Sequence, residues 1–255
     1  MNDALQLKHV SYSYHTKSGE TYALYDISLT IPQGSFVSVV GPSGCGKSTL
    51  LSLIAGTLRP ESGQILVGGK PVGESDSQIG YMLQHDHLFE WRSVYGNVIL
   101  GLEIRKKKDA GSLEYVNSLL NQYGLGDFKG SRPSELSGGM RQRAALIRTL
   151  ALEPDLLLLD EPFSALDYQT RLTVGDDIGT IIKKERKTAV LVTRDLSEAI
   201  SLGDTVYVLS KRPGKIVASI PIKFTGGDLT PMERRNAPEF KDYFNMLWRE
   251  LNENA

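Results

Sequence analysis

Residues 35–54 read SFVSVVGPSGCGKSTLLSLI, and the order of features in this stretch decides the fold. The segment 35–40 is an apolar run of strand length, which is typical of a strand buried on both faces of a sheet. A glycine-rich segment follows it, and the apolar spacing from residue 47 onward predicts a helix. Strand, glycine loop and helix in this order predict the first unit of an α/β fold, in which helices cover a mostly parallel sheet.

The glycine-rich segment GPSGCGKST (41–49) matches the phosphate-loop pattern G-x-x-x-x-G-K-[S/T]. Glycines allow the backbone to curl so that successive N–H groups point at a β-phosphate, and the following helix adds its positive dipole end. Lys47 is expected to reach the β- and γ-phosphates, Ser48 to coordinate Mg²⁺ and Thr49 to bond the α-phosphate. The residues predicted to bind the nucleotide are Gly41, Ser43, Gly44, Cys45, Gly46, Lys47, Ser48 and Thr49. By itself this pattern predicts a nucleoside triphosphate and no more.

A second apolar run, LLLLDEP (156–162), contains two adjacent carboxylates. Ligands bind at the carboxyl ends of the strands in open parallel sheets, so this strand is expected to deliver both side chains to the phosphate loop. Asp160 is predicted to hold the Mg²⁺ shell through water. Glu161 is predicted to polarise the attacking water.

Patterns elsewhere complete the α/β prediction. The first thirty residues are rich in β-branched and aromatic side chains and predict two strands joined by a turn at 15–20. Strands are also predicted at 188–193 and 204–210, with a helix over 164–185. Between 85 and 152 the strand signals stop and helical spacing replaces them. The predicted fold is therefore a phosphate-loop NTPase core with a mostly parallel sheet, an N-terminal antiparallel β region and an inserted helical subdomain.

The chain is expected to form one domain over 1–220, with its helical subdomain at about 85–152, followed by a C-terminal helical tail over 221–255. The apolar residues of the tail that share one helical face are Phe240, Phe244, Leu247 and Trp248. We expect this face to pack back on the domain, and a surface for a partner protein is the alternative.

The amino-acid composition excludes several classes of protein function. The 255 residues include 29 basic and 30 acidic side chains, and the resulting net charge of −1 argues against a general nucleic-acid-binding surface. A single cysteine excludes an internal disulfide framework and a cysteine-rich metal site. The sequence shows neither a signal-peptide pattern nor the roughly 18 apolar residues of a membrane-spanning helix. The chain is therefore expected in the cytosol, where it can work at a membrane if a partner supplies the spans.

Residues 136–167, LSGGMRQRAALIRTLALEPDLLLLDEPFSALD, closely resemble the ATP-binding cassette (ABC) family. They carry an LSGGQ-type sequence, here LSGGM, before the acidic strand, and the likeness runs from about residue 5 to about residue 220. The resemblance implies that two cassettes, identical or paired, bind head to tail around two ATP molecules with Mg²⁺. It assigns Ser137, Gly138 and Gly139 to the γ-phosphate of the ATP held by the partner cassette, which suits a helix start with a hydroxyl and free N–H groups.

Further site residues follow from the same resemblance. Gln84, in IGYMLQ, matches the family glutamine that contacts Mg²⁺ and the attacking water. Asp167 matches the aspartate that communicates across the dimer. Tyr14, in VSYSYHT, matches the aromatic residue that stacks on adenine, and Tyr12 is the alternative.

The sequence departs from the family at one catalytic position. After AVLVT the family has a histidine that touches the γ-phosphate and helps orient the water, and Arg194 stands in its place here. Arginine keeps its charge and donates to phosphate, but it cannot accept a hydrogen bond, and it can draw Glu161 into an ion pair. We expect ATP binding and dimer closure to persist while turnover falls by about tenfold to a thousandfold.

The segment QHDHLFEWRSVYGNV (84–98) resembles one branch of the family, the importers of nitrate, sulfonate, taurine and related solutes, with thiamine-precursor importers nearby. Glu90 stands where proline is common in that branch. The family places a short helix of a membrane subunit in the groove beside this segment, and Leu88, Phe89 and Trp91 are the candidate contact.

The function predicted from this resemblance is the ATP-hydrolysing subunit of an importer, at the cytoplasmic face of the cell membrane. Its partners are transmembrane permease subunits and, indirectly, an extracytoplasmic solute-binding protein; nucleic acid is not among them. A hydrolysis-impaired regulatory cassette and a soluble ABC ATPase without a transport role are the alternatives.

Overall fold

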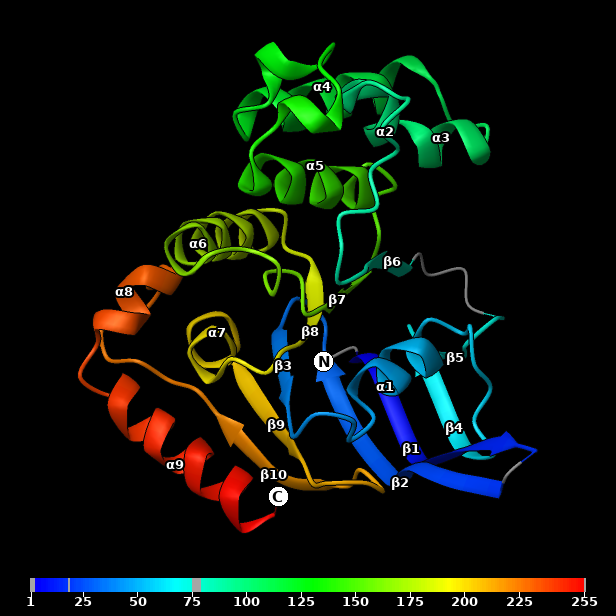
Figure 1. The fold of residues 1–255 in the computed structure, drawn as a ribbon, viewed down its shortest axis with the longest axis vertical. Helices are drawn as coiled ribbons and strands as arrows, with labels where there is room; N and C mark the ends of the chain where they lie inside the picture. Colours follow the sequence, from blue (N-terminus) through cyan, green and yellow to red (C-terminus); the bar gives the residue numbers. More distant parts are fainter. Residues whose placement is uncertain (1–2, 18, 75–78, 255) are drawn as a thin grey trace.

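The computed structural model describes residues 3–17, 19–74 and 79–254, which form two β-sheets and the helices around them (Figure 1). The strands are β1 (Asp3–Thr16), β2 (Gly19–Pro32), β3 (Phe36–Val40), β4 (Ser62–Val67), β5 (Lys70–Pro71), β6 (Ile79–Met82), β7 (Leu156–Asp160), β8 (Thr188–Val192), β9 (Thr205–Leu209) and β10 (Ile216–Pro221). The helices are α1 (Lys47–Ile54), α2 (Val94–Val98), α3 (Leu100–Ile104), α4 (Ala110–Gln122), α5 (Gly138–Leu150), α6 (Tyr168–Lys184), α7 (Leu196–Leu202), α8 (Pro231–Asn236) and α9 (Phe240–Glu253), with the 3-10 turns η1 (Gly126–Phe128) and η2 (Pro133–Glu135).

The larger sheet has the strand order β10-β9-β3-β8-β7-β6. Its pairs are parallel except for β10 on β9, which is antiparallel. Every residue of β3, β7 and β8 is buried, because one face of these strands packs on α1 and on β1 and β2, and the other face packs on α5, α6 and α7. The carboxyl ends of these strands therefore meet at one edge, where the phosphate loop follows β3 and the two acidic residues end β7.

The smaller sheet has the order β2-β1-β4-β5 and is antiparallel throughout. The predicted N-terminal antiparallel region and its turn are confirmed, since β1 ends at Thr16 and β2 begins at Gly19. The strands β4 and β5 were not predicted. One continuous apolar cluster links the two sheets through α1, with Leu50 and Leu51 of that helix packed among residues of β1 and β3.

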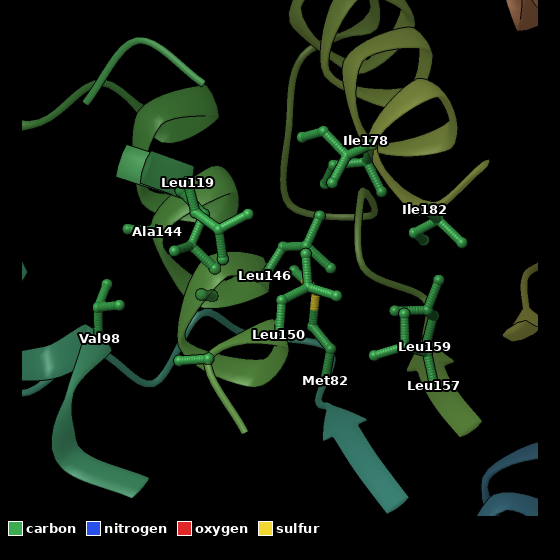
Figure 2. Close-up of a cluster of buried hydrophobic side chains, with 14 of the residues drawn as sticks. Met82, Val98, Leu119, Ala144, Leu146, Leu150, Leu157, Leu159, Ile178 and Ile182 are labelled. Atoms are coloured by element: carbon green, nitrogen blue, oxygen red, sulfur yellow. The ribbon is translucent and has the colours of Figure 1, made fainter. Parts of the chain in front are cut away.

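Between β6 and β7 the chain builds a helical layer, which Figure 1 shows on the far side of β6 and β7 from the smaller sheet. Figure 2 shows how α5 holds this layer to the sheet: Leu146 and Leu150 point toward Met82 of β6 and toward Ile178 of α6. The side chains of Val116 and Leu119 in α4 are buried in the same cluster. The division of the chain into 1–220 and 221–255 stays a prediction.

The tail forms α8 and α9, and α9 packs on the β9–β10 edge of the larger sheet (Figure 1). Leu247 is fully buried there, and Phe240 and Phe244 are partly buried against the same cluster. The prediction was wrong for Trp248, whose side chain is 56% exposed. The reason is that the apolar stripe of α9 is wider than the surface it covers. Among the described residues, no helix has the length and apolar character needed to cross a bilayer.

Candidate functional site

A cavity of 330 Å³ opens at the carboxyl edge of the larger sheet, in front of the phosphate loop. Its lining residues are Tyr14, Ala23, Ser43, Gly44, Gly46, Lys47, Ser48, Thr49, Gln84, Glu161, Arg194 and Arg212. The phosphate loop and the second acidic element, which lie more than a hundred residues apart in the sequence, therefore share one cavity. Gly41 and Cys45 belong to the loop but not to this lining, and the thiol of Cys45 is buried beneath it.

The curl of the loop depends on backbone that glycine permits. Gly46 has φ of 110°, and a Cβ there would lie 2.7 Å from Leu24 Cδ2. Lys47 opens α1 and is buried, with Nζ donating to the carbonyl oxygens of Gly41 at 2.8 Å and Pro42 at 3.0 Å. The ammonium is thus held inside the curl, where a phosphate oxygen offers it a charged and stronger acceptor than a carbonyl.

Asp160 ends β7 beside the first turn of α1. Its Oδ1 accepts from Ser48 Oγ at 3.2 Å, and its Oδ2 accepts from the Tyr81 hydroxyl at 3.4 Å. Burial raises the pKa of Asp160, and burial next to this carboxylate raises the pKa of Tyr81 to about 12. A buried carboxylate with a hydroxyl beside it is an oxygen donor set of the kind that Mg²⁺ prefers, and the cation would supply the charge that burial makes costly.

Glu161 lies one residue beyond β7, in a backbone conformation that few residues other than glycine adopt. Its φ is 43°, and its N–H donates to the carbonyl of Val192 at 2.8 Å, which fixes this turn against the end of β8. Non-glycine residues with positive φ are strained and are found disproportionately at functional sites. The turn directs the Glu161 side chain into the cavity in front of the phosphate loop.

Arg194 forms the ion pair with Glu161 that the sequence suggested. Both Nε and Nη2 of Arg194 lie 2.9 Å from Glu161 Oε2. The guanidinium is half exposed, whereas the carboxylate is mostly covered. Two N–H groups of one guanidinium therefore point at a single carboxylate oxygen of Glu161. A water molecule that donates a hydrogen bond to this oxygen would have to compete with them.

Gln84 and Tyr14 both line the cavity. Gln84 Nε2 donates to Ser164 Oγ at 3.3 Å, and Ser164 Oγ donates to the carbonyl of Glu161 at 2.9 Å. The Tyr14 hydroxyl lies 3.0 Å from Thr49 Oγ1, and its ring is 41% exposed at the cavity wall. Tyr12 stands edge-on to Tyr14 and does not line the cavity, so the geometry favours Tyr14 over Tyr12 for stacking on a base.

The remaining predicted residues lie at two other helix starts. Ser137 is the N-cap of α5 and accepts from the N–H of Met140 at 3.3 Å, with Gly138 and Gly139 as the first two helical residues. Asp167 is the N-cap of α6, and the hydrogen bonds donated by Thr170 lower the pKa of its carboxyl group. Of the described residues that line the cavity, none comes from these two caps. Ser137 is exposed, so its helix start is open to a ligand held elsewhere.

The sequence profile described as ABC transporter matches residues 24–164, which include the phosphate loop and the acidic strand. The chain belongs to the ABC transporter family. As an ABC ATP-binding protein it is 46% identical to the uncharacterized ABC transporter ATP-binding protein YtlC of Bacillus subtilis, over 97% of this chain and 95% of that one. It is 38% identical to the taurine import ATP-binding protein TauB of Roseobacter denitrificans, over 96% of this chain and 94% of that one.

Solved structures of ABC cassettes have the same fold. The dimeric post-hydrolysis structure of the cassette MJ0796, bound to ADP and Pi, matches with a TM-score of 0.73 at 28% identity, over 87% of this chain and 100% of that one. CbiO1 of Clostridium perfringens, part of the transporter complex cbiONQ, matches with a TM-score of 0.76 at 26% identity, over 96% of each chain. The predicted cassette fold is confirmed.

Three residues of the ABC site were not predicted. Tyr81 bonds Asp160, Ser164 links Gln84 to the backbone of Glu161, and Arg212 lines the cavity from a loop after β9. Tyr81 lies in a strand three residues before Gln84, so its approach to Asp160 depends on the pairing of β6 with β7. Arg212 reaches the site through the chain topology, so no local pattern distinguishes it. Ser164 lies only three residues after Glu161, but its partner Gln84 is 80 residues away in the sequence.

The buried carboxyl group of Glu198, which lines a cavity together with Arg194, predicts a pH dependence of the cassette's stability. Glu198 in α7 accepts from the Thr193 hydroxyl at 2.6 Å and faces Asp195, Arg171 and Arg235. Burial raises the pKa of Glu198 to about 7. A carboxyl group whose pKa is raised by folding favours the folded state while it is protonated, and this contribution is lost as the pH rises toward 7 and through it.

The Glu198→Gln variant is therefore expected to raise the melting temperature at pH 8 and to leave it nearly unchanged at pH 5. The difference in melting temperature between variant and wild type should grow steadily between these values, as followed by calorimetry or circular dichroism. Glu114→Gln, at an exposed position of α4, is the control and should show a difference that does not change over this range. A pH-independent difference for Glu198→Gln would contradict the prediction.

Proposed function

We propose that this chain is the ATP-hydrolysing subunit of an importer, in which two cassettes close around ATP and so drive separate membrane subunits. The observation that carries the proposal is the division of the predicted machinery between two places. The phosphate loop and Glu161 share one cavity, while the exposed helix start at Ser137 lies outside that cavity's described lining. A second copy can complete the cavity by bringing its own Ser137 to the γ-phosphate, as the family resemblance implies.

Within one copy, some residues would bind the nucleotide and others would act on the attacking water. Lys47 and the backbone of the phosphate loop would hold the β- and γ-phosphates, and Tyr14 would stack on adenine. Ser48 and Asp160 would hold Mg²⁺, with Gln84 near the attacking water; the cation would neutralise charge that develops on the phosphates. Glu161 would accept a hydrogen bond from that water and orient it toward the γ-phosphate.

Between copies, the N-terminus of α5 is the proposed contact to the γ-phosphate. Gly138 is partly buried and Gly139 is buried, whereas Ser137 at the helix start is exposed, and the positive end of the helix dipole favours a negative group there. Asp167, at the start of α6, would communicate across the same interface. MJ0796, which resembles this chain over 87% of its length, is described as dimeric.

An exposed aromatic patch, formed by Phe89 and Trp91, is the proposed contact to the membrane subunits. Trp91 is 71% exposed, and its ring lies 4.6 Å from that of Phe89. Leu88, which the sequence placed in this contact, is only 8% exposed and belongs to the core instead. The backbone of Phe89 is fixed by buried Asn97, which accepts from its N–H at 2.7 Å and donates to its carbonyl at 3.0 Å.

The patch is tied to the helix that starts at Ser137. Arg148 of α5 donates to the carbonyls of Asp86 at 2.6 Å and His87 at 2.7 Å. Arg141, on the same helix, pairs with the Asp86 carboxylate at 3.2 Å. Glu90, which replaces the usual proline, accepts from the N–H of Ser134 at 3.1 Å. A displacement of the patch is thereby transmitted to α5, and this is how ATP-driven closure would reach the membrane subunits.

For the solute, we propose a small anion or zwitterion of the nitrate, sulfonate or taurine type, or a thiamine precursor. The support is the segment 84–98 and the identity to proteins named as taurine import subunits. Solute choice would lie with the membrane subunits and a solute-binding protein outside the membrane. The cassette itself would sit at the cytoplasmic face.

The membrane contact can be tested by fractionation. When the chain is expressed together with its candidate membrane subunits, we expect it to sediment with membranes. We expect the Trp91→Asp substitution to shift most of the chain to the supernatant. The physical reason is that a carboxylate at the centre of an apolar contact must be desolvated without a partner.

Tyr22→Asp is the matched control, because it places the same charge on another exposed aromatic position, in β2. This variant should remain with the membranes. Equal sedimentation of the Trp91 and Tyr22 variants would refute the proposed contact. Loss of the wild-type chain from the membranes would refute the transport role itself.

A regulatory cassette that binds ATP but hydrolyses it very slowly is the second candidate. The specific observation in its favour is the ion pair between Arg194 and Glu161, which occupies the expected catalytic carboxylate. The two candidates differ in turnover rather than in ATP binding, and rate measurements on variants of these two residues separate them.

A further inference from the structure

The loop after β9 carries a cation that touches the phosphate loop directly. Arg212 donates from Nε at 3.0 Å and from Nη2 at 2.8 Å, and both hydrogen bonds go to the carbonyl oxygen of Gly44. Arg212 also lines the cavity in front of the phosphate loop. The family resemblance assigned no role to this residue.

The carbonyl that Arg212 holds belongs to the peptide between Gly44 and Cys45. A trans peptide is planar, with its C=O and its N–H pointing in opposite directions. When Arg212 fixes the Gly44 carbonyl, the Cys45 N–H must point away from Arg212. The structure shows this N–H directed across the curl, where it donates to Pro42 O at 3.3 Å. A long bond of this kind leaves the donor ready for a better acceptor.

The loop that presents Arg212 is itself firmly held. The N–H of Gly214 donates to the carbonyl of Ala23 at 2.9 Å, and the N–H of Tyr25 donates to the Gly214 carbonyl at 2.9 Å. Gly214 also packs so closely under the phosphate loop that a Cβ there would lie 2.3 Å from the carbonyl oxygen of Cys45. Arg212 is therefore presented by a fixed platform on β2, and its two hydrogen bonds can hold the orientation of the Gly44 peptide.

We propose that Arg212 is a positioning residue of the nucleotide site, which holds the Gly44–Cys45 peptide so that the Cys45 N–H faces the β-phosphate of the bound nucleotide. The inference rests on nucleotide binding at the phosphate loop. A donor that is already oriented costs no reorganisation on binding, so its loss weakens affinity. The loss of affinity is expected for every ligand that has a β-phosphate, which includes both ATP and ADP.

The test is equilibrium binding of ATP, ADP and AMP, by calorimetry or a fluorescent competitor, to the full chain and its variants. Arg212→Gln is expected to lower the affinity for ATP and for ADP by the same factor, about tenfold, and to leave the affinity for AMP unchanged. Arg212→Lys keeps the charge but loses the two-pronged donor, so it should recover only part of the affinity. Arg249→Gln removes the same charge from the exposed side of α9 and should bind all three nucleotides as the wild type does.

Each other result has a definite meaning. Wild-type affinity in Arg212→Gln, or full recovery in Arg212→Lys, would overturn the positioning role, because orientation by two hydrogen bonds would then not matter. A loss confined to ATP would place Arg212 on the γ-phosphate, and an equal loss for AMP would place it on the nucleoside; both overturn the proposal. A wild-type chain that bound none of the three would refute nucleotide binding itself. Thermal unfolding without nucleotide checks that each variant is folded. If the Arg212→Gln variant does not fold, the affinities of the Arg212→Lys variant decide the test.

Discussion

Replacing Arg194 with histidine is expected to raise the steady-state rate of ATP hydrolysis by about tenfold to a thousandfold. In the wild-type chain, two donors of Arg194 lie 2.9 Å from Glu161 Oε2. One of the two carboxylate oxygens of Glu161 is therefore held by the guanidinium, which competes with the attacking water for this oxygen and offsets the negative charge of the carboxylate. A neutral histidine releases this oxygen, and it also offers a ring nitrogen that can accept a hydrogen bond. Phosphate release from the purified chain at saturating ATP measures the effect.

Arg194→Gln separates the two parts of this explanation, because it removes the ion pair without supplying an imidazole. If release of Glu161 dominates, glutamine recovers much of the gain; if the imidazole is needed, only histidine does. ATP affinity should change little in either variant, since the cradle at 41–49 is intact. Equal turnover in the wild-type and Arg194→His chains would show that the ion pair does not limit hydrolysis.

The Glu161→Gln variant is expected to lose hydrolysis by about a hundredfold to ten-thousandfold while keeping ATP affinity. Glutamine keeps the size of the side chain and its ability to bond water, but it has no charge with which to polarise it. The backbone turn at φ of 43° is unaffected by the change, so the variant should fold as the wild type does. The rate is measured as phosphate release, and the affinity by calorimetry.

This substitution should be measured in two backgrounds, because residues in direct contact are not additive. In the Arg194→His background the full loss is expected. In the wild-type background the loss is smaller if Arg194 already occupies the carboxylate, and it vanishes if the chain is a regulatory cassette without turnover. A hydrolysis rate that survives Glu161→Gln in both backgrounds would place the catalytic base on another residue.

The parts of the site that the sequence predicted are those with a local pattern. The glycine loop, the acidic strand end and the helix start at Ser137 are each contained in fewer than ten consecutive residues. In each stretch, the residue types are those that the local backbone requires. The strand before the phosphate loop and the helix after it could therefore be predicted directly. The larger sheet was predicted in outline for the same reason, because β3, β7 and β8 are short apolar runs buried at every position.

The parts that were missed depend on which distant segments meet. Arg212 reaches Gly44 only because β9 lies next to β3 in the sheet, and its sequence, between a lysine and a proline, resembles that of any surface turn. The edge strand β10 has a single buried residue, and β4 begins with three exposed residues, so neither is buried along its length as a central strand is. Leu88 and Trp248 were assigned to the wrong environment because spacing predicts a face but not how far the neighbouring surface extends.

The central claim is that ATP is held between the phosphate loop of one copy and the Ser137 helix start of another. Analytical ultracentrifugation of the Glu161→Gln chain with saturating ATP and Mg²⁺ tests it most directly. The account predicts a monomer without nucleotide and a dimer with ATP. It also predicts that adding Ser137→Glu, which sets a negative charge against the γ-phosphate, restores the monomer while each chain still binds ATP. A chain that stays monomeric with ATP, or a dimer that persists with Ser137→Glu, would contradict the account.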